Sequence, residues 1–197
     1  EAGHWKNRRA LLVDEIRQID PDVLCMQEVD FYEEFWIDAL KELGYDSVHQ
    51  PKMNSMREVK QYGLCVAWKH DLLELVDYEL LEYQALSEHL TGLKFFELCK
   101  SNVAQICGFR VRESSGGDHS NVSFIVTNTH AFWRKNYHYT RLRQICYLFE
   151  RLRLFNMDRN WPIITLGDFN MTPSSVLYKI LTGDRNFTED DEGIKEF

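Results

Sequence analysis

Asp168 and Asn170 are placed for chemistry, because both follow directly on a short apolar run. The run, Ile163-Ile164-Thr165-Leu166, predicts a buried strand. If the strand geometry continues, the two side chains point to the same side and Phe169 turns into the core. Gly167 leaves room for another backbone or a ligand to come close. A carboxylate and a carboxamide at the C-terminal end of a strand face the crevice in which α/β sheets bind ligands.

Glu28 and His130 end two further apolar runs in the same way. A carboxylate such as Glu28 is the ligand that Mg²⁺ prefers. His130 shares a face with Asn128 and could donate a hydrogen bond to a phosphoryl oxygen that gains charge in a transition state. Ordinary explanations also exist, since acidic and amide residues are common in strand-to-helix turns and a lone histidine is more often structural. The residue types alone leave both readings open.

Three short motifs resemble signatures of the endonuclease/exonuclease/phosphatase superfamily. Leu-Gly-Asp-Phe-Asn-Met-Thr-Pro resembles its Gly-Asp-Phe-Asn motif, Gln-Glu-Val-Asp resembles its Gln-Glu-Val motif, and Asn-Thr-His resembles a third motif that lies between them. The resemblance implies an α/β fold, a two-sheet sandwich of mixed and largely antiparallel sheets flanked by helices. It also implies that Glu28 binds Mg²⁺ or Mn²⁺, that Asp168 is the general base, and that His130 and Asn170 contact the phosphate.

The segment after His130 points to one branch of this superfamily. Aromatic and basic residues alternate there, and they either stack a base and attract phosphate or pin the following helix. The spacing is similar to that of the deadenylase, nocturnin and Angel branch, which implies that Trp133 and Arg141 bind substrate. Asn102 matches a position that this branch uses near the substrate. The implied activity is a 3′-exoribonuclease acting on the 3′ end of RNA.

Other readings remain beside the exoribonuclease. A small phosphorylated nucleotide is an alternative substrate, either through removal of a 2′-phosphate from a dinucleotide or through opening of a 2′,3′-cyclic phosphate. A lipid or inositol phosphatase fits the segment after His130 less well. A non-catalytic interaction domain that keeps the fold is the alternative of another class. Protein partners cannot be inferred from the sequence.

The chain departs from the superfamily pattern at both ends. No asparagine-bearing first strand precedes Glu28, and no Ser-Asp-His motif follows Gly183. We therefore expect a fragment of a longer enzyme, truncated at both ends, which lacks two strands. Loss of the histidine in that motif is expected to cost several orders of magnitude in rate.

Composition narrows the class of protein. A chain of 197 residues is the size of one domain. Its net charge of −8 argues against non-specific electrostatic binding of nucleic acid over a broad surface. No apolar run approaches the roughly 20 residues that cross a bilayer, so we expect no membrane association. The odd number of cysteines, five, and the absence of CxxC pairs indicate reduced thiols in a cytoplasmic or nuclear protein.

Apolar periodicity predicts an alternation of helices and strands in a single domain. Helices are predicted at residues 5–19, 31–43, 139–156 and 174–183, and strands at 22–28, 62–69, 72–83, 102–113, 121–129 and 163–167. Residues 114–118 are predicted to form a hairpin loop, and residues 50–61 and 84–101 to form loops with helical turns. Thr172 is expected to cap the last helix with Pro173 in its first turn, and Gly183 to end it.

Overall fold

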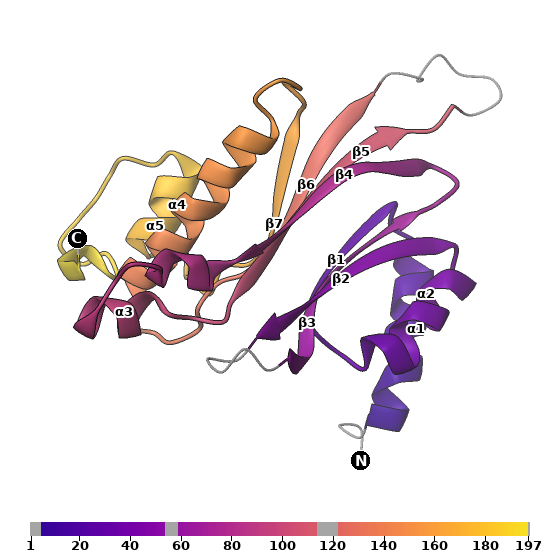
Figure 1. Ribbon diagram of the computed structural model, residues 1–197, viewed down its shortest axis with the longest axis horizontal. Helices are drawn as coiled ribbons and strands as arrows, with labels where there is room; N and C mark the ends of the chain where they lie inside the picture. Colours follow the sequence, from indigo (N-terminus) through magenta and orange to yellow (C-terminus); the bar gives the residue numbers. More distant parts are fainter. Residues whose placement is uncertain (1–4, 54–58, 114–121, 197) are drawn as a thin grey trace.

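Two sheets packed face to face, with helices on their outer sides, form the protein in the computed structural model, which describes residues 5–53, 59–113 and 122–196. Figure 1 shows α1 and α2 outside the first sheet, and α4 and α5 outside the second. The predicted sandwich is therefore confirmed. Within the described ranges, no helix is both long enough and apolar enough to span a membrane.

The first sheet has three antiparallel strands in the order β1-β3-β2. The second has the order β4-β5-β6-β7, with antiparallel pairs except for the parallel pair of β6 and β7. The strands are β1 (Val23–Asp30), β2 (Tyr45–Met53), β3 (Val59–Lys69), β4 (Leu73–Glu82), β5 (Val103–Val111), β6 (Ser123–His130) and β7 (Ile163–Asp168). The helices are α1 (Trp5–Ile19), α2 (Ile37–Glu42), α3 (Gly92–Leu98), α4 (His138–Phe155) and α5 (Val176–Thr182).

Most predicted elements are confirmed to within a few residues. The predicted helix at residues 31–43 is a π-helical turn at Tyr32–Trp36 that continues into α2. The helical turns expected at residues 84–101 are a 3₁₀ helix at Tyr83–Ser87 and α3. The hairpin loop expected at residues 114–118 lies outside the described residues. Helix α4 makes the crossover that the parallel pair of β6 and β7 requires.

The prediction of a loop at residues 50–61 was wrong at both ends of that range. Strand β2 continues to Met53 and β3 begins at Val59. Pro51 is compatible with β2 because β2 is an edge strand, where a proline is tolerated. A Cβ atom at Gly63 of β3 would lie 2.1 Å from the carbonyl oxygen of Gln50, so glycine allows the two strands to approach there.

Strand β7 is less buried than predicted. Ile163, Ile164 and Leu166 are 43%, 48% and 41% exposed, because among the described strands β7 pairs with β6 alone and is the edge of its sheet. The prediction that the 163–167 run is a buried strand was therefore right about the strand and wrong about its burial.

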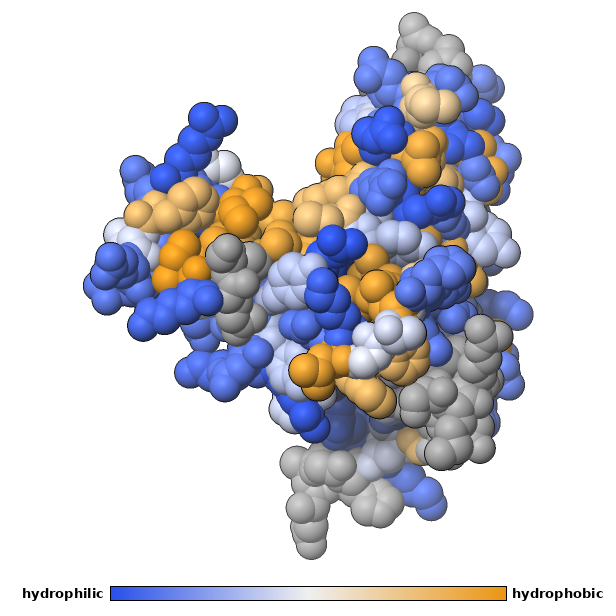
Figure 2. Space-filling view, turned by 60° about the vertical axis from the view of Figure 1, so that its left-hand side comes forward, coloured by the Kyte–Doolittle hydropathy of each residue, from blue (hydrophilic) through white to orange (hydrophobic). Residues whose placement is uncertain are grey.

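The face of the molecule shown in Figure 2 is deeply notched, and hydrophobic side chains line much of the notch.

The cap of the last helix was also predicted wrongly. Ser175, rather than Thr172, caps α5, and its Oγ accepts a hydrogen bond from the backbone N–H of Tyr178 at 3.2 Å. The helix therefore begins after Pro173 instead of including it in its first turn. Gly183 ends the helix as predicted, with a positive φ of 75°.

The five cysteines are free thiols. Cys65 and Cys107 are buried, whereas Cys146 is exposed. Burial raises the pKa of Cys25 and Cys107 to about 12, which keeps both thiols protonated and unreactive.

A network of buried amide side chains joins the two sheets. Asn128 of β6 is fully buried, and its Oδ1 accepts a hydrogen bond from Gln27 of β1 at 2.8 Å. Its Nδ2 donates to the carbonyl oxygens of Met26 and Cys65 and to Oε1 of Gln105, at 3.0, 3.2 and 3.2 Å. Apolar residues of both sheets, including Val66, Cys107 and Val126, pack farther along the interface. The network fixes how β1 lies against β6.

We predict that Asn128→Ala lowers the free energy of unfolding by about 2–3 kcal/mol, because it leaves buried partners from both sheets without their hydrogen bonds. Chemical denaturation of both proteins measures the difference. The matched control is Asn136→Ala at an exposed position, for which a change within about 0.5 kcal/mol is expected. Equal stability of Asn128→Ala and the wild type would contradict the role of the network.

Candidate active site

Asp168 and His130 end two neighbouring parallel strands. They are register partners in the pairing of β7 with β6, and Nε2 of His130 lies 3.8 Å from Oδ2 of Asp168. The close approach depends on Gly167, because a Cβ atom there would lie 2.2 Å from the carbonyl oxygen of Thr129. The sequence-based expectation of a close backbone at Gly167 is confirmed.

A turn after β7 brings Asn170 next to Asp168. The strand ends at Asp168, and Asn170 has a left-handed backbone with φ of 50°. Its N–H donates to Oδ1 of Asp168 at 2.9 Å, and its Nδ2 donates to the carbonyl oxygen of Ala131 at 2.9 Å. The two side chains are therefore together, as predicted, but not through continued strand geometry. Phe169 is half-buried rather than part of the core.

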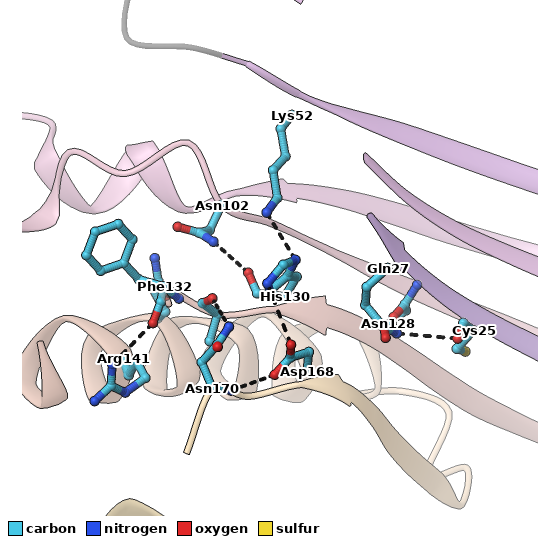
Figure 3. A network of polar contacts seen from close by, with 12 residues as sticks. Cys25, Gln27, Lys52, Asn102, Asn128, His130, Phe132, Arg141, Asp168 and Asn170 are labelled. Atoms are coloured by element: carbon cyan, nitrogen blue, oxygen red, sulfur yellow. Dashed lines mark hydrogen bonds and ion pairs between the residues drawn. The ribbon is translucent and has the colours of Figure 1, made fainter. Parts of the chain in front are cut away.

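Lys52 of β2 contacts the other side of the His130 ring (Figure 3). Its Nζ lies 3.1 Å from Nδ1 of His130, and both residues are buried. The pKa of His130 lies below its ordinary value of 6.5, mainly because burial disfavours the imidazolium and secondly because of the Lys52 charge. Asp168 and Glu28 act in the opposite direction.

Glu28 lies on a β-bulge of β1. The register between β1 and β3 shifts between Met26 and Val29, and Glu28 has a φ of 56°. Such a bulge turns a side chain out of the regular ladder. The Glu28 carboxylate is exposed and lies close enough to His130 to affect its pKa. Strand β1 packs against both β6 and β7, so the strand that carries Glu28 lies next to the strands that carry His130 and Asp168.

The acidic groups suit one kind of metal site better than another. No three His, Cys, Asp or Glu side chains gather around one point among the described residues. A structural zinc site needs such a group, whereas Mg²⁺ is often held by one or two carboxylates together with water and substrate phosphate. The exposed Glu28 carboxylate fits the second kind.

Asn102 and Arg141 are buried next to the site, and Arg141 also lines the pocket beside Asp168 and Asn170. Asn102 is 6% exposed and donates to the carbonyl oxygen of His130 at 2.8 Å. Arg141 is 1% exposed, and its guanidinium donates to the carbonyl oxygens of Phe132, Arg134 and Lys135 at 3.2, 2.6 and 2.8 Å. These contacts hold His130 and the following loop in place. Direct contact of Asn102 or Arg141 with substrate stays a prediction.

Trp133 is the exposed aromatic residue of the loop. It is 66% exposed, and the guanidinium carbon of Arg134 lies 5.5 Å from its ring centre. A pocket of about 380 Å³ is lined by Trp133, Asp168, Asn170 and Glu192, among others. The pocket therefore joins the exposed aromatic ring to the polar residues at the strand ends.

Sequence reasoning missed Lys52 and the amide network. Lys52 belongs to the segment that was predicted as a loop, and the residues Val48 to Met53 show no regular apolar alternation that would have indicated a strand. The partner of Asn128 across the sheets could not be inferred, because Gln27 and Asn128 are 101 residues apart.

Comparison with known proteins agrees with this geometry. The chain belongs to the Endonuclease/Exonuclease/phosphatase family, whose model matches residues 1–193. It is similar to the probable RNA exonuclease NGL3 of Saccharomyces cerevisiae, with 30% identity over 183 residues. These are 90% of this chain and 34% of NGL3, so the chain spans about a third of that relative.

Two solved structures have the same fold. The human Nocturnin catalytic domain with a bound sulfate anion has a TM-score of 0.75 at 25% identity, over 93% of this chain and 64% of that chain. ANGEL2, a 2′,3′-cyclic phosphatase in complex with adenosine-2′,3′-vanadate, has a TM-score of 0.75 at 23% identity, over 91% of this chain and 49% of that chain.

The lowered pKa of His130 predicts a pH dependence of stability. In the unfolded chain His130 regains its ordinary pKa of 6.5, so over the interval between the two pKa values the unfolded state binds a proton that the folded state does not. The free energy of unfolding therefore decreases as the pH falls below about 6.5. We expect His130→Gln to lose less stability than the wild type between pH 7 and pH 5.

Denaturant unfolding at the two pH values measures this difference. His49, whose pKa is also lowered by burial, is present in both proteins and cancels. An equal or larger loss in His130→Gln would show that His130 is not held neutral by its surroundings.

Proposed function

We propose that this chain carries the active site of a Mg²⁺-dependent phosphodiesterase that acts on the 3′ end of RNA, as a deadenylase does. The observation that carries the proposal is the meeting of His130, Asp168 and Asn170 at the ends of β6 and β7, with Glu28 of β1 nearby. Membership of the family and the similarity to a probable RNA exonuclease support it.

Asp168 is proposed as the general base. Its side chain is 52% exposed, so water reaches the carboxylate. Oδ1 is held by the backbone N–H of Asn170, which fixes the orientation of the group. The carboxylate would then take a proton from a water molecule as the water attacks phosphorus in line with the leaving oxygen.

His130 and Asn170 are proposed to hold the phosphoryl oxygens. The carboxamide of Asn170 has two N–H groups, and its hydrogen bond to the carbonyl oxygen of Ala131 uses one of them. Nε2 of His130 faces the same carboxylate as Asn170 does. N–H donors that are already in place stabilise charge as it develops on an oxygen, since no reorganisation is needed during the reaction.

A Mg²⁺ ion on Glu28 would offset the negative charge of the phosphate and of the leaving oxygen. The base that precedes or follows the cleaved bond would occupy the pocket beside Trp133, whose exposed ring offers a face for stacking. Backbone contacts of Asn102 and Arg141 would keep this loop and His130 in register during binding.

The nucleotide reactions are the second candidate, favoured by the fold shared with Nocturnin and with ANGEL2, a 2′,3′-cyclic phosphatase. Both reactions would use the same residues and differ in what occupies the pocket. A non-catalytic interaction domain is opposed by the assembly of all four side-chain types in one place.

The test is Mg²⁺-dependent release of nucleotides from a 3′-poly(A) RNA oligomer by this chain and by the longest natural chain that contains it. Asp168→Ala is expected to reduce the rate by roughly 10²–10⁴-fold, the usual contribution of a general base. The matched control is Asp158→Ala, which removes an exposed carboxylate from the turn after α4 and should leave the rate unchanged.

Other outcomes separate the alternatives. Loss of phosphate from a 2′-phosphorylated dinucleotide, or opening of a cyclic end without shortening of RNA, would keep the mechanism and change the substrate. Full activity of Asp168→Ala would exclude Asp168 as the base. A folded natural chain that cleaves none of these phosphate esters would support the interaction domain.

A further inference from the structure

Lys52 and Asp168 contact opposite sides of the His130 imidazole. Nζ of Lys52 lies 3.1 Å from Nδ1, and Oδ2 of Asp168 lies 3.8 Å from Nε2. Figure 3 shows the ring between the two side chains. Lys52 is 5% exposed and His130 is 6% exposed, so little water competes for the Nδ1 side of the ring.

The contact with Lys52 determines which ring nitrogen of His130 carries the proton. A lysine ammonium has three N–H donors and no acceptor, so it can hydrogen-bond only to an unprotonated ring nitrogen. A neutral imidazole carries a single ring proton, and the hydrogen bond made by one nitrogen decides which nitrogen is protonated. With Nδ1 accepting from Lys52, the proton lies on Nε2.

We propose that Lys52 is a positioning residue that fixes His130 in the tautomer protonated at Nε2. The N–H donor of the ring is thereby aimed at the side of the site where Asp168 lies. This inference rests on the proposed function for the identity of the acceptor, a phosphoryl oxygen. The tautomer itself is a property of the protein without substrate.

Strand β2 positions the Lys52 side chain against His130. Val48, Gln50 and Lys52 lie on one face of β2, and Gln50 donates to the carbonyl oxygen of Leu81 in the second sheet at 3.0 Å. The Lys52 ammonium also lies 5.4 Å from the ring centre of Tyr62. Lys52 therefore crosses from the first sheet to a histidine of the second.

A fixed Nε2–H tautomer suits a donor that stays neutral. The charged groups that affect His130 are Lys52 from β2, Asp168 from β7 and Glu28 from β1, and burial together with Lys52 gives the pKa a net lowering. The imidazole can then donate to an oxygen that gains charge without first taking up a proton.

The direct test is an NMR spectrum of the imidazole nitrogens in the ¹⁵N-histidine-labelled chain, without metal or substrate, at a pH where His130 is neutral. We expect a protonated Nε2 and an unprotonated Nδ1 in the wild type. In Lys52→Met, exchange between the tautomers should move the two nitrogen signals toward each other. Lys52→Arg keeps a donor and should retain the wild-type pattern. Lys69→Met removes a lysine whose acidic partners are Asp20 and Asp22, and should also change nothing at His130.

Two results would overturn the proposal. One is a protonated Nδ1 in the wild type, which decides the question even if Lys52→Met does not fold. The other is a folded Lys52→Met protein in which both ring signals are unchanged.

A kinetic experiment tests the consequence for the reaction. If Lys52 acts through His130, Lys52→Met should lower kcat roughly 10–100-fold, as for other residues that orient an imidazole. The same substitution in a His130→Ala background should have no further effect. An equal loss in both backgrounds would mean that Lys52 acts on the substrate directly and would overturn the positioning role. Absence of activity in the wild type would count against the proposed function, while the NMR result would still decide the tautomer.

Discussion

The hydrogen bond between the half-buried Gln27 and the fully buried Asn128 determines how the two sheets lie against each other. A polar group without water must find a partner inside the protein, and each partner here comes from the opposite sheet or from a neighbouring strand. The residue after Gln27 is Glu28, and two residues after Asn128 comes His130. The contact that satisfies the amides therefore also brings an acidic side chain of one sheet to the histidine of the other.

The strand ends could be predicted from the sequence because the signals are local. An apolar run followed by a polar residue predicts the end of a strand, and His130 and Asp168 do end β6 and β7. The same pattern placed the end of β1 at Glu28, two residues too early, because β1 continues through a bulge to Asp30. The close approach at Gly167 was also predictable, since a residue without a side chain is needed where backbones nearly touch.

The remaining features depend on distant parts of the chain. Lys52 was missed because it lies in the segment predicted as a loop, and the position of β2 at the sheet edge is what makes Pro51 compatible with a strand. The turn at Asn170 depends on its bond to Ala131, which lies 39 residues earlier. Burial of β7 was overestimated because burial depends on what packs beside a strand, which an apolar run does not reveal.

The central claim is that the strand ends of both sheets form one metal-dependent phosphate site. Its most direct measurement is the broadening of backbone NMR signals by added Mn²⁺ in the wild type and in Glu28→Gln. The account predicts broadening at residues around Glu28, His130 and Asp168 that is lost in Glu28→Gln. Broadening confined to the acidic residues 189–192, or unchanged by Glu28→Gln, would contradict it.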